Sequence, residues 1–279
     1  MFEIINRQAC KRKAAELLRT ASVPAKAFTA LYMALILLLN LIDGFAGDGI
    51  VGTFVSILTS LLASVLYAGF LMYCMAIRRG ERAEYLTLFD GFSFVGKIIS
   101  LEIVEYFFIF LWSLLFLIPG IVAAYRYKFA RFNLYENPGI GVMEAMDMSK
   151  RQSLGYKSQL FMLDLSYLGW QILSILPTLV ASTMALQAYD YSNAYYVYTA
   201  GIPDPAAYLG IPAWSWIVIQ GLWGLAVSLF YYPHYSCVYL EYFENAKRTS
   251  GIGKDAGPRN NGGWNNGWGS QGPDGLGGF

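Results

Sequence analysis

Residues 50–77 read IVGTFVSILTSLLASVLYAGFLMYCMAI, a run of 28 residues without a charged side chain. A helix crosses the hydrocarbon core of a bilayer with about 20 predominantly apolar residues, so this stretch is long enough to span a membrane with some tilt. Further apolar runs occupy residues 27–42, 98–125, 160–187 and 213–232. The sequence therefore predicts an all-α protein, a polytopic bundle of transmembrane helices.

The composition agrees with this fold class and excludes several others. Of the 279 residues, 56% are hydrophobic and 14% are charged, whereas a soluble domain carries roughly 25% charged residues. The formal net charge of +1 argues against a basic surface that binds nucleic acid. The apolar content excludes a chain that is disordered throughout, and three scattered cysteines do not make a disulfide framework.

A basic segment, residues 1–26, precedes the first apolar run. Its cations favour a short helix over residues 7–19 that lies on an anionic leaflet. A secretory signal peptide is the alternative, because a basic stretch before an apolar run is typical of such peptides. Two acids, Asp43 and Asp48, follow the run and make a poor cleavage site. We therefore favour a retained first span, which can begin as early as Pro24.

Lysine and arginine are confined to four segments of the chain. Six lie up to Lys26, four in residues 78–97, six in residues 126–157 and four from residue 247 onward, which together are all 20. The connections 43–49 and 188–212 hold none and carry acids instead. Because Lys and Arg in short loops stay on the cytoplasmic side, we expect a multi-pass protein of the cell membrane with both termini cytoplasmic.

This distribution creates a topological problem, because only one apolar run, residues 98–125, separates two basic segments that belong on the same side. The run either enters the bilayer and returns without crossing, or forms a hairpin that crosses twice. We favour a hairpin at residues 98–135 with its turn at residues 114–119, which makes about six spans. The transmembrane domain would then cover residues 27–246.

Acids inside the apolar runs form a candidate intramembrane charge cluster. A charge at the bilayer centre costs about 2.5–3.5 kcal/mol on insertion scales, so such residues usually have partners. A hairpin centred between Leu115 and Phe116 places Glu105 opposite Arg126, and we expect this pair to form. The alternative is that the acids lie among the headgroups and need no partner. The cluster consists of Glu102, Glu105, Arg126 and Asp164, of which Asp164 is interpreted as a structural acid near the basic surface.

Small residues recur every four positions in the run 50–77. On a helix they make one ridge, along which a neighbouring backbone can approach closely. We interpret the ridge as a helix-packing seam, and a polar pore lining is the alternative. Its members are Gly52, Ser56, Ser60, Ser64 and Ala68.

Three other segments have their own character. Residues 138–153 follow Asn137 and predict an interfacial amphipathic helix, in which Asp147 can pair with Arg151. The connection 188–212 is rich in tyrosine, which is typical of an aromatic belt, with a ligand platform as the alternative. Residues 247–279 are a Gly-, Asn- and Trp-rich stretch, which we expect to be a disordered cytoplasmic tail.

No motif in the sequence points to catalysis. One histidine, His234, and three distant cysteines do not supply a zinc set, and neither a phosphate-binding loop nor a nucleophile elbow is present. We expect no catalytic residue, no metal site and no cofactor, and therefore a protein that is not an enzyme.

The stretch from Leu111 to Ile121, LWSLLFLIPGI, carries a resemblance to a known family together with Asn137-Pro138 and Gly169-Trp170. With these motifs the chain resembles a family of uncharacterised bacterial integral membrane proteins, domain of unknown function 975. The resemblance extends to about residue 246 and is most specific over residues 111–174. It implies a multi-pass membrane protein and transfers no catalytic residue, because the family has no agreed activity.

We expect a non-enzymatic membrane bundle whose partners are membrane lipids, other membrane proteins or copies of itself, and not nucleic acid. A small transporter or channel that uses the intramembrane acids is the alternative.

Overall fold

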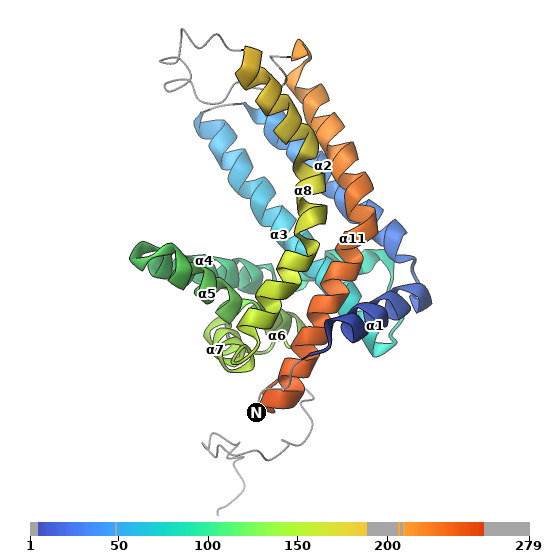
Figure 1. Ribbon diagram of the computed structural model, residues 1–279, viewed down its shortest axis with the longest axis vertical. Helices are drawn as coiled ribbons and strands as arrows, with labels where there is room; N and C mark the ends of the chain where they lie inside the picture. Colours follow the sequence, from blue (N-terminus) through green and yellow to red (C-terminus); the bar gives the residue numbers. More distant parts are fainter. Residues whose placement is uncertain (1–4, 48, 189–205, 207–208, 254–279) are drawn as a thin grey trace, which may run out of the picture.

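The computed structural model describes residues 5–47, 49–188, 206 and 209–253 (Figure 1). Within these residues the regular structure is helical, which confirms the predicted all-α fold class. Five helical stretches are long and apolar enough to cross a membrane, which indicates a membrane-embedded protein. They are Ala25–Ala46, Ile50–Arg79, Tyr85–Leu115, Lys157–Met184 and Ala213–Ser250.

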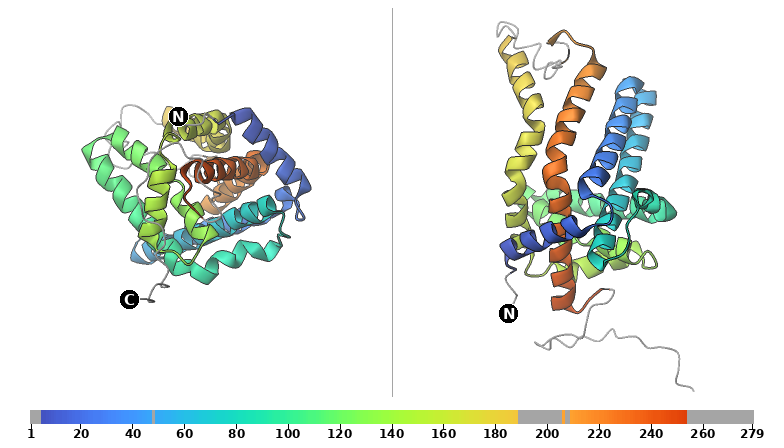
Figure 2. Two further views of the ribbon diagram at one scale, coloured as in Figure 1. Left: turned by 90° about the horizontal axis from the view of Figure 1, so that it is seen from below. Right: turned by 90° about the vertical axis from the view of Figure 1, so that its right-hand side faces the viewer.

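Four long helices run along the long axis of the molecule, and we call them the pillar (Figures 1 and 2). They are α2 (Ala25–Ala46), α3 (Ile50–Arg79), α8 (Lys157–Ala188) and α11 (Ala213–Ser250). The first three begin and end close to the predicted apolar runs. The expected seam of small residues therefore lies on one helix of the pillar, α3.

Shorter helices surround the lower ends of α3 and α11, and we call this region the base (Figures 1 and 2). They are α1 (Arg7–Thr20), the 3-10 helix η1 (Tyr85–Phe94), α6 (Ala130–Glu136) and α7 (Val142–Gln152). The Asn6 side chain caps α1 by accepting from the amides of Gln8 and Ala9. In α7, Asp147 pairs with Lys150 at 2.6 Å rather than with the expected Arg151, because Lys150 lies on the next turn of the same face.

The remaining two helices, α4 (Val95–Leu115) and α5 (Leu117–Tyr127), form the predicted hairpin, with the turn where it was expected. Their orientation differs from the expectation that both arms cross the bilayer. The hairpin lies across the pillar in two views (Figures 1 and 2). In addition, α5 has 11 residues and is roughly 16 Å long, against about 30 Å of hydrocarbon. A hairpin of these dimensions in this position would return to its own side of a membrane, which would keep the two basic segments together.

Helix α11 is longer than the predicted run, which was expected to end at Pro233. It continues through Pro233 to Ser250, so its last turn also passes the expected start of the tail at residue 247. Proline removes one helical hydrogen bond, but the turns beyond it are buried in the base, including Leu240 and Phe243. Packing therefore keeps this half helical. Nearly all of the tyrosine-rich connection, and the tail beyond residue 253, lie outside the described residues.

The two ends of the pillar differ in burial. Large side chains in the base and the adjoining turns are buried, and the rings of Phe28 and Tyr73 stack with centroids 3.8 Å apart. In the upper half of α3, by contrast, Ile50, Phe54 and Ile57 are exposed. The protein core thus lies in the lower half, and the upper half presents apolar side chains to its surroundings.

Candidate functional site

The turn of the α4–α5 hairpin is a single residue, Phe116. Its amide donates to the carbonyl of Trp112 at 3.5 Å, and its carbonyl accepts from the amide of Gly120 at 3.4 Å. Pro119 stands in the first turn of α5, where a missing amide costs no helical hydrogen bond. These two bonds pair the amide and the carbonyl of the turn residue itself.

Close contact between the two arms depends on Gly120. A Cβ at this position would clash with the Ser113 side chain, so a glycine allows α5 to lie directly against α4. The Ser113 hydroxyl donates to the carbonyl of Ile109 at 2.8 Å, one turn earlier in the same helix. The hairpin is thus a narrow element with its polar groups paired internally.

The outer surface of the hairpin is apolar on all sides. At the tip, the side chains of Phe116, Leu117 and Ile118 are 74%, 75% and 73% exposed. Further exposed apolar residues follow both arms back toward the base, namely Ile103, Tyr106, Phe107, Phe110, Leu111, Leu114, Leu115, Ile121 and Val122. A continuous exposed surface of so many apolar side chains marks a region that contacts lipid or another protein.

The charges at the root of the hairpin pair differently from the prediction. Glu105 accepts from Arg131 Nε at 3.1 Å, and Glu102 lies 3.9 Å from the same guanidinium. The predicted Glu105–Arg126 pair is therefore wrong. The prediction treated the second arm as one straight helix, whereas α5 ends at Tyr127 and α6 starts a new direction at Ala130, which brings Arg131 to Glu105.

Arg126 is connected to α7 through its backbone instead. Its carbonyl accepts from the hydroxyls of Ser149 at 2.9 Å and Ser153 at 3.3 Å. These bonds satisfy a carbonyl near the end of α5, where helical acceptors lack partners. The predicted cluster thus divides, with Glu102 and Glu105 on Arg131 and Arg126 beside α7.

Asp164, the fourth member of the predicted cluster, is held by tyrosines. Its carboxylate accepts from the hydroxyls of Tyr125 at 2.8 Å, Tyr235 at 2.9 Å and Tyr239. Because these groups belong to α5, α8 and α11, the bonds link three helices to one another. The geometry agrees with the interpretation of Asp164 as a structural acid. The sequence signal for its partners was the spacing of Tyr235 and Tyr239, one helical turn apart.

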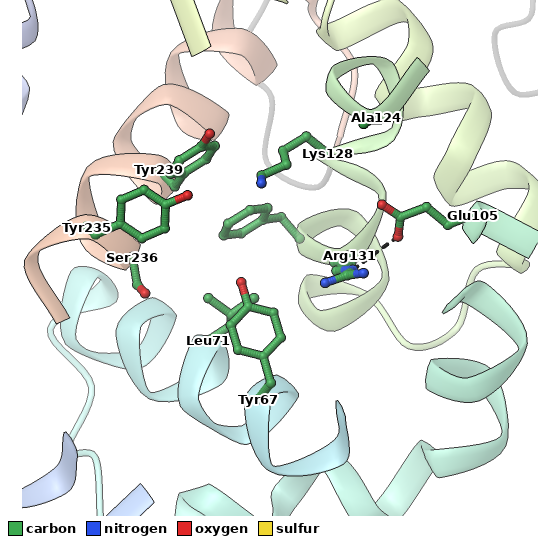
Figure 3. A pocket seen from close by; sticks show the side chains of 10 residues that line it. Tyr67, Leu71, Glu105, Ala124, Lys128, Arg131, Tyr235, Ser236 and Tyr239 are labelled. Atoms are coloured by element: carbon green, nitrogen blue, oxygen red, sulfur yellow. Dashed lines mark hydrogen bonds and ion pairs between the residues drawn. The ribbon is translucent and has the colours of Figure 1, made fainter. Parts of the chain in front are cut away.

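A small cavity lies between the Glu105–Arg131 pair and two of the tyrosines that bind Asp164, Tyr235 and Tyr239. It measures about 130 Å³ and lies between α3, α4, the α5–α6 bend and α11 (Figure 3). Lys128 points into it, with its ammonium 5.0 Å from the centre of the Tyr239 ring. Burial lowers the pKa of Lys128, although Asp164 and Glu105 oppose that effect. The volume suffices for several waters, which would solvate the ammonium.

The predicted seam on α3 is packed at its two ends. Gly52 is buried against the Gly47 carbonyl, and the Ser56 hydroxyl donates to Asp43 of α2. At the lower end Ala68 is fully buried beside η1. Between them Ser60 is exposed and Ser64 is partly buried, so the ridge contacts two different neighbours rather than one.

An ion-pair network in the base was missed by the sequence reasoning. Lys247 binds Glu136 at 2.7 Å and Glu244 at 3.1 Å, and both Lys247 and Glu136 are almost fully buried. Glu241, also buried, accepts from Lys13 and Arg78, each at 2.7 Å. The network fastens the lower end of α11 to α1, α3 and α6. The only sequence signal was the density of charge near residues 241–248.

His234 lies at the junction of α1, α8 and α11. Its Nε2 is 2.9 Å from the carbonyl of Lys11, and its Nδ1 is 2.7 Å from the hydroxyl of Tyr167. Since a carbonyl only accepts, Nε2 carries the proton and Nδ1 accepts from the tyrosine in the neutral ring. Among the residues that the structure describes, no group of three His, Cys, Asp or Glu side chains is placed to hold a metal ion.

Residues 114–249 match the family model described as Protein of unknown function (DUF975), which confirms the resemblance expected from the sequence. The matched stretch starts in the last turn of α4 and ends one residue before the end of α11. It includes Arg126, Arg131 and Asp164, and excludes Glu102 and Glu105. No curated protein and no solved structure matches the chain.

Proposed function

We propose that this chain, in which residues 114–249 match a family of unknown function, is a non-enzymatic membrane protein that embeds the α4–α5 hairpin in one leaflet. The observation that carries the proposal is the exposed apolar surface of a hairpin that lies across the pillar (Figure 1). A helix that is apolar on all sides is normally buried in protein or in lipid. Protein covers little of the apolar surface of the α4–α5 hairpin.

The hairpin suits hydrocarbon because its backbone is self-contained. Lipid offers no hydrogen bonds, so a segment that enters and returns needs a turn with few free amides and carbonyls. The bonds of Phe116 to Trp112 and Gly120 meet this requirement for the turn residue itself. Seated in one leaflet, the hairpin adds volume to that leaflet without crossing the other.

The basic base supports assignment of this leaflet to the cytoplasmic side of the cell membrane. Lys97 at the start of α4 and Arg126 and Lys128 beside the end of α5 stand at the root of the hairpin. Helix α1 and the end of α11 belong to the same base, so both described ends of the chain are assigned to the cytoplasm. Cations near an anionic leaflet add attraction of about 1 kcal/mol each.

Transport through the intramembrane acids has less support. Glu105 is ion-paired with Arg131, Glu102 lies 3.9 Å from the same guanidinium, and Asp164 is held by three hydroxyls. A group that carries ions through a membrane must exchange partners, whereas these acids are fixed between helices. We therefore favour contact with lipid over transport by this cluster.

Site-directed spin labelling in phosphatidylcholine and phosphatidylglycerol nanodiscs tests the position of the hairpin. A nitroxide on Phe116→Cys would report the tip, Ile57→Cys the exposed upper half of α3, and Glu81→Cys the base. The three native cysteines are buried, which limits background labelling. We expect oxygen, which concentrates in lipid, to reach the label at residue 116 as it reaches residue 57. A water-soluble nickel chelate should reach only residue 81.

Two results would contradict the proposal. Nickel access at residue 116 equal to that at residue 81 would place the tip in water, and low access of both oxygen and nickel there would place it against a protein. In sealed vesicles of the same lipids, reaction of Phe116→Cys with an impermeant maleimide added to the side opposite Glu81→Cys would show that the hairpin crosses.

A further inference from the structure

A second cavity lies far from the base, between the upper halves of α2, α8 and α11. Its volume is about 550 Å³. Along α2 it extends from Met33 to Gly44, eleven residues or roughly 16 Å of helix. It is therefore an elongated groove that follows the pillar, independent of the hairpin and of the function proposed for it.

The groove is polar at its outer end. Asp43 and Asn40 line it there from α2, and Gln220 lines it from α11. The Gln220 amide donates to Thr178 of α8 at 2.9 Å, and Asp43 accepts from the Ser56 hydroxyl. Hydrogen-bonding side chains from α2, α8 and α11 thus line this end of the groove, and apolar side chains such as Leu37, Ile175 and Leu225 line the walls below it together with Ser174 and Ser228.

Asp43 is the one charged side chain that lines the groove, and the structure gives it no cationic partner among the described residues. The described lysines and arginines belong to α1, to the base, to the root of the hairpin or to the lower ends of the long helices. Even Lys26, on the same helix as Asp43, is seventeen residues or roughly 25 Å away along the axis. A carboxylate in such surroundings attracts a cation supplied from outside the chain.

Met33, Leu225 and Ser228 line the lower end of the groove, so one serine hydroxyl stands there among apolar side chains. Directly below, the rings of Tyr32, Phe70 and Tyr232 pack together with centroids 5.0 to 5.7 Å apart. The groove therefore ends within the pillar and does not continue to the base, which fits a binding site better than a conduction path.

From these features we propose that the groove binds a cationic amphiphile, an alkyl chain with a quaternary or protonated amine. The positive head lies at Asp43 beside Asn40 and Gln220. The alkyl chain follows the apolar walls past Leu37 and Ile175 toward Leu225. The negative charge of Asp43 at one end and the length of the groove beyond it select this class of ligand over anionic and zwitterionic lipids.

Electron spin resonance of the full chain in phosphatidylcholine nanodiscs tests the proposal with a hexadecyl quaternary-ammonium nitroxide. We expect a motionally restricted component that saturates near one probe per protein. Asp43→Asn keeps the shape of the side chain and removes its charge, so the apparent Kd should rise at least tenfold. A doxyl stearate, with an anionic head, should give no saturable component.

A second variant acts on the space rather than on the charge. A side chain at Gly224 enters the open groove, since nothing lies within 4 Å of a Cβ there, so Gly224→Phe should abolish the restricted component. The matched controls are Leu222→Phe, exposed on the same helix, and Asp147→Asn in the base, and both should bind as the native chain does. Thermal unfolding of each variant verifies folding.

Three outcomes would overturn the inference. Equal binding of the ammonium and stearate probes would remove charge selection, as would unchanged binding in folded Asp43→Asn. Retention of the restricted component in folded Gly224→Phe would place the probe outside the groove.

Discussion

The upper half of the pillar and the base are built for different surroundings, although the same helices pass through both. In the upper half of α3, Ile50 is 91% exposed, and the polar contacts there are single bonds such as that of Ser56 with Asp43. In the base, aromatic rings and ion pairs are buried together. Lipid is as apolar as leucine, so burial of apolar side chains in protein gives no net drive there. Where water surrounds the base, burial of apolar side chains in protein again stabilises the fold.

Helix α11 shows the difference within one element. Its upper turns expose Ile219 and Leu222, whereas the turns from Ser236 to Phe243 are buried. The change of surroundings coincides with Pro233, where the helix can lose a backbone bond without ending. A long helix thus anchors in lipid at one end and in a protein core at the other.

Replacing a buried acid of the base gives the largest expected effect. Glu136, with 6% of its side chain exposed, binds Lys247 at 2.7 Å and Arg79 at 3.3 Å. In Glu136→Gln the buried ammonium loses its main counter-charge, so we expect the free energy of unfolding to fall by about 3 kcal/mol. Unfolding by sodium dodecyl sulfate in mixed micelles would measure it.

The matched control is Asp147→Asn, which also removes an acid from an ion pair in the base. Asp147 is 57% exposed, so its bond to Lys150 should contribute at most about 0.5 kcal/mol. If Glu136→Gln cost no more than this control, the network around Lys247 would be solvated and the base would lack a protein core.

Close backbone packing in the base gives an intermediate effect. A Cβ at Gly69 of α3 would clash with the backbone of Leu88 in η1, which no side-chain rotation relieves. We expect Gly69→Ala to lower the free energy of unfolding by about 1–3 kcal/mol through overpacking. Gly96→Ala is the control, because nothing lies within 4 Å of a Cβ there and alanine favours the helix. Equal effects of the two would show that α3 and η1 separate readily.

Much of the architecture followed from patterns that act over short distances. Apolar run length located the long helices, and the confinement of lysine and arginine required a segment that returns to its own side. The orientation of the α4–α5 hairpin could not be predicted from the sequence, because a crossing hairpin and a returning one both satisfy the same distribution of lysine and arginine. The length of α5 and its position across the pillar favour the returning form that we propose (Figure 1).

The charge partners could not be read from the sequence for a related reason. Pairing Glu105 with Arg126 required two straight arms, and the bend between Tyr127 and Ala130 is set by packing of α6 in the base. The three hydroxyls around Asp164 come from α5 and α11, and only tertiary contacts bring them together. Residue types indicated that the acids need partners, but not which ones.

The smallest expected effect lies in the upper half, at Ser60 of the predicted seam. Ser60 is exposed, whereas Ala68, two turns below on the same ridge, is fully buried. If Ser60 faces lipid, Ser60→Leu should change the free energy of unfolding in bicelles by no more than about 0.5 kcal/mol, since leucine is favoured there. Ala68→Leu should cost about 1–3 kcal/mol, because overpacking acts only where protein surrounds the side chain. A large loss from Ser60→Leu would instead mean that polar surroundings face this position, as the pore-lining alternative requires, and would remove the contrast between the two halves of the pillar.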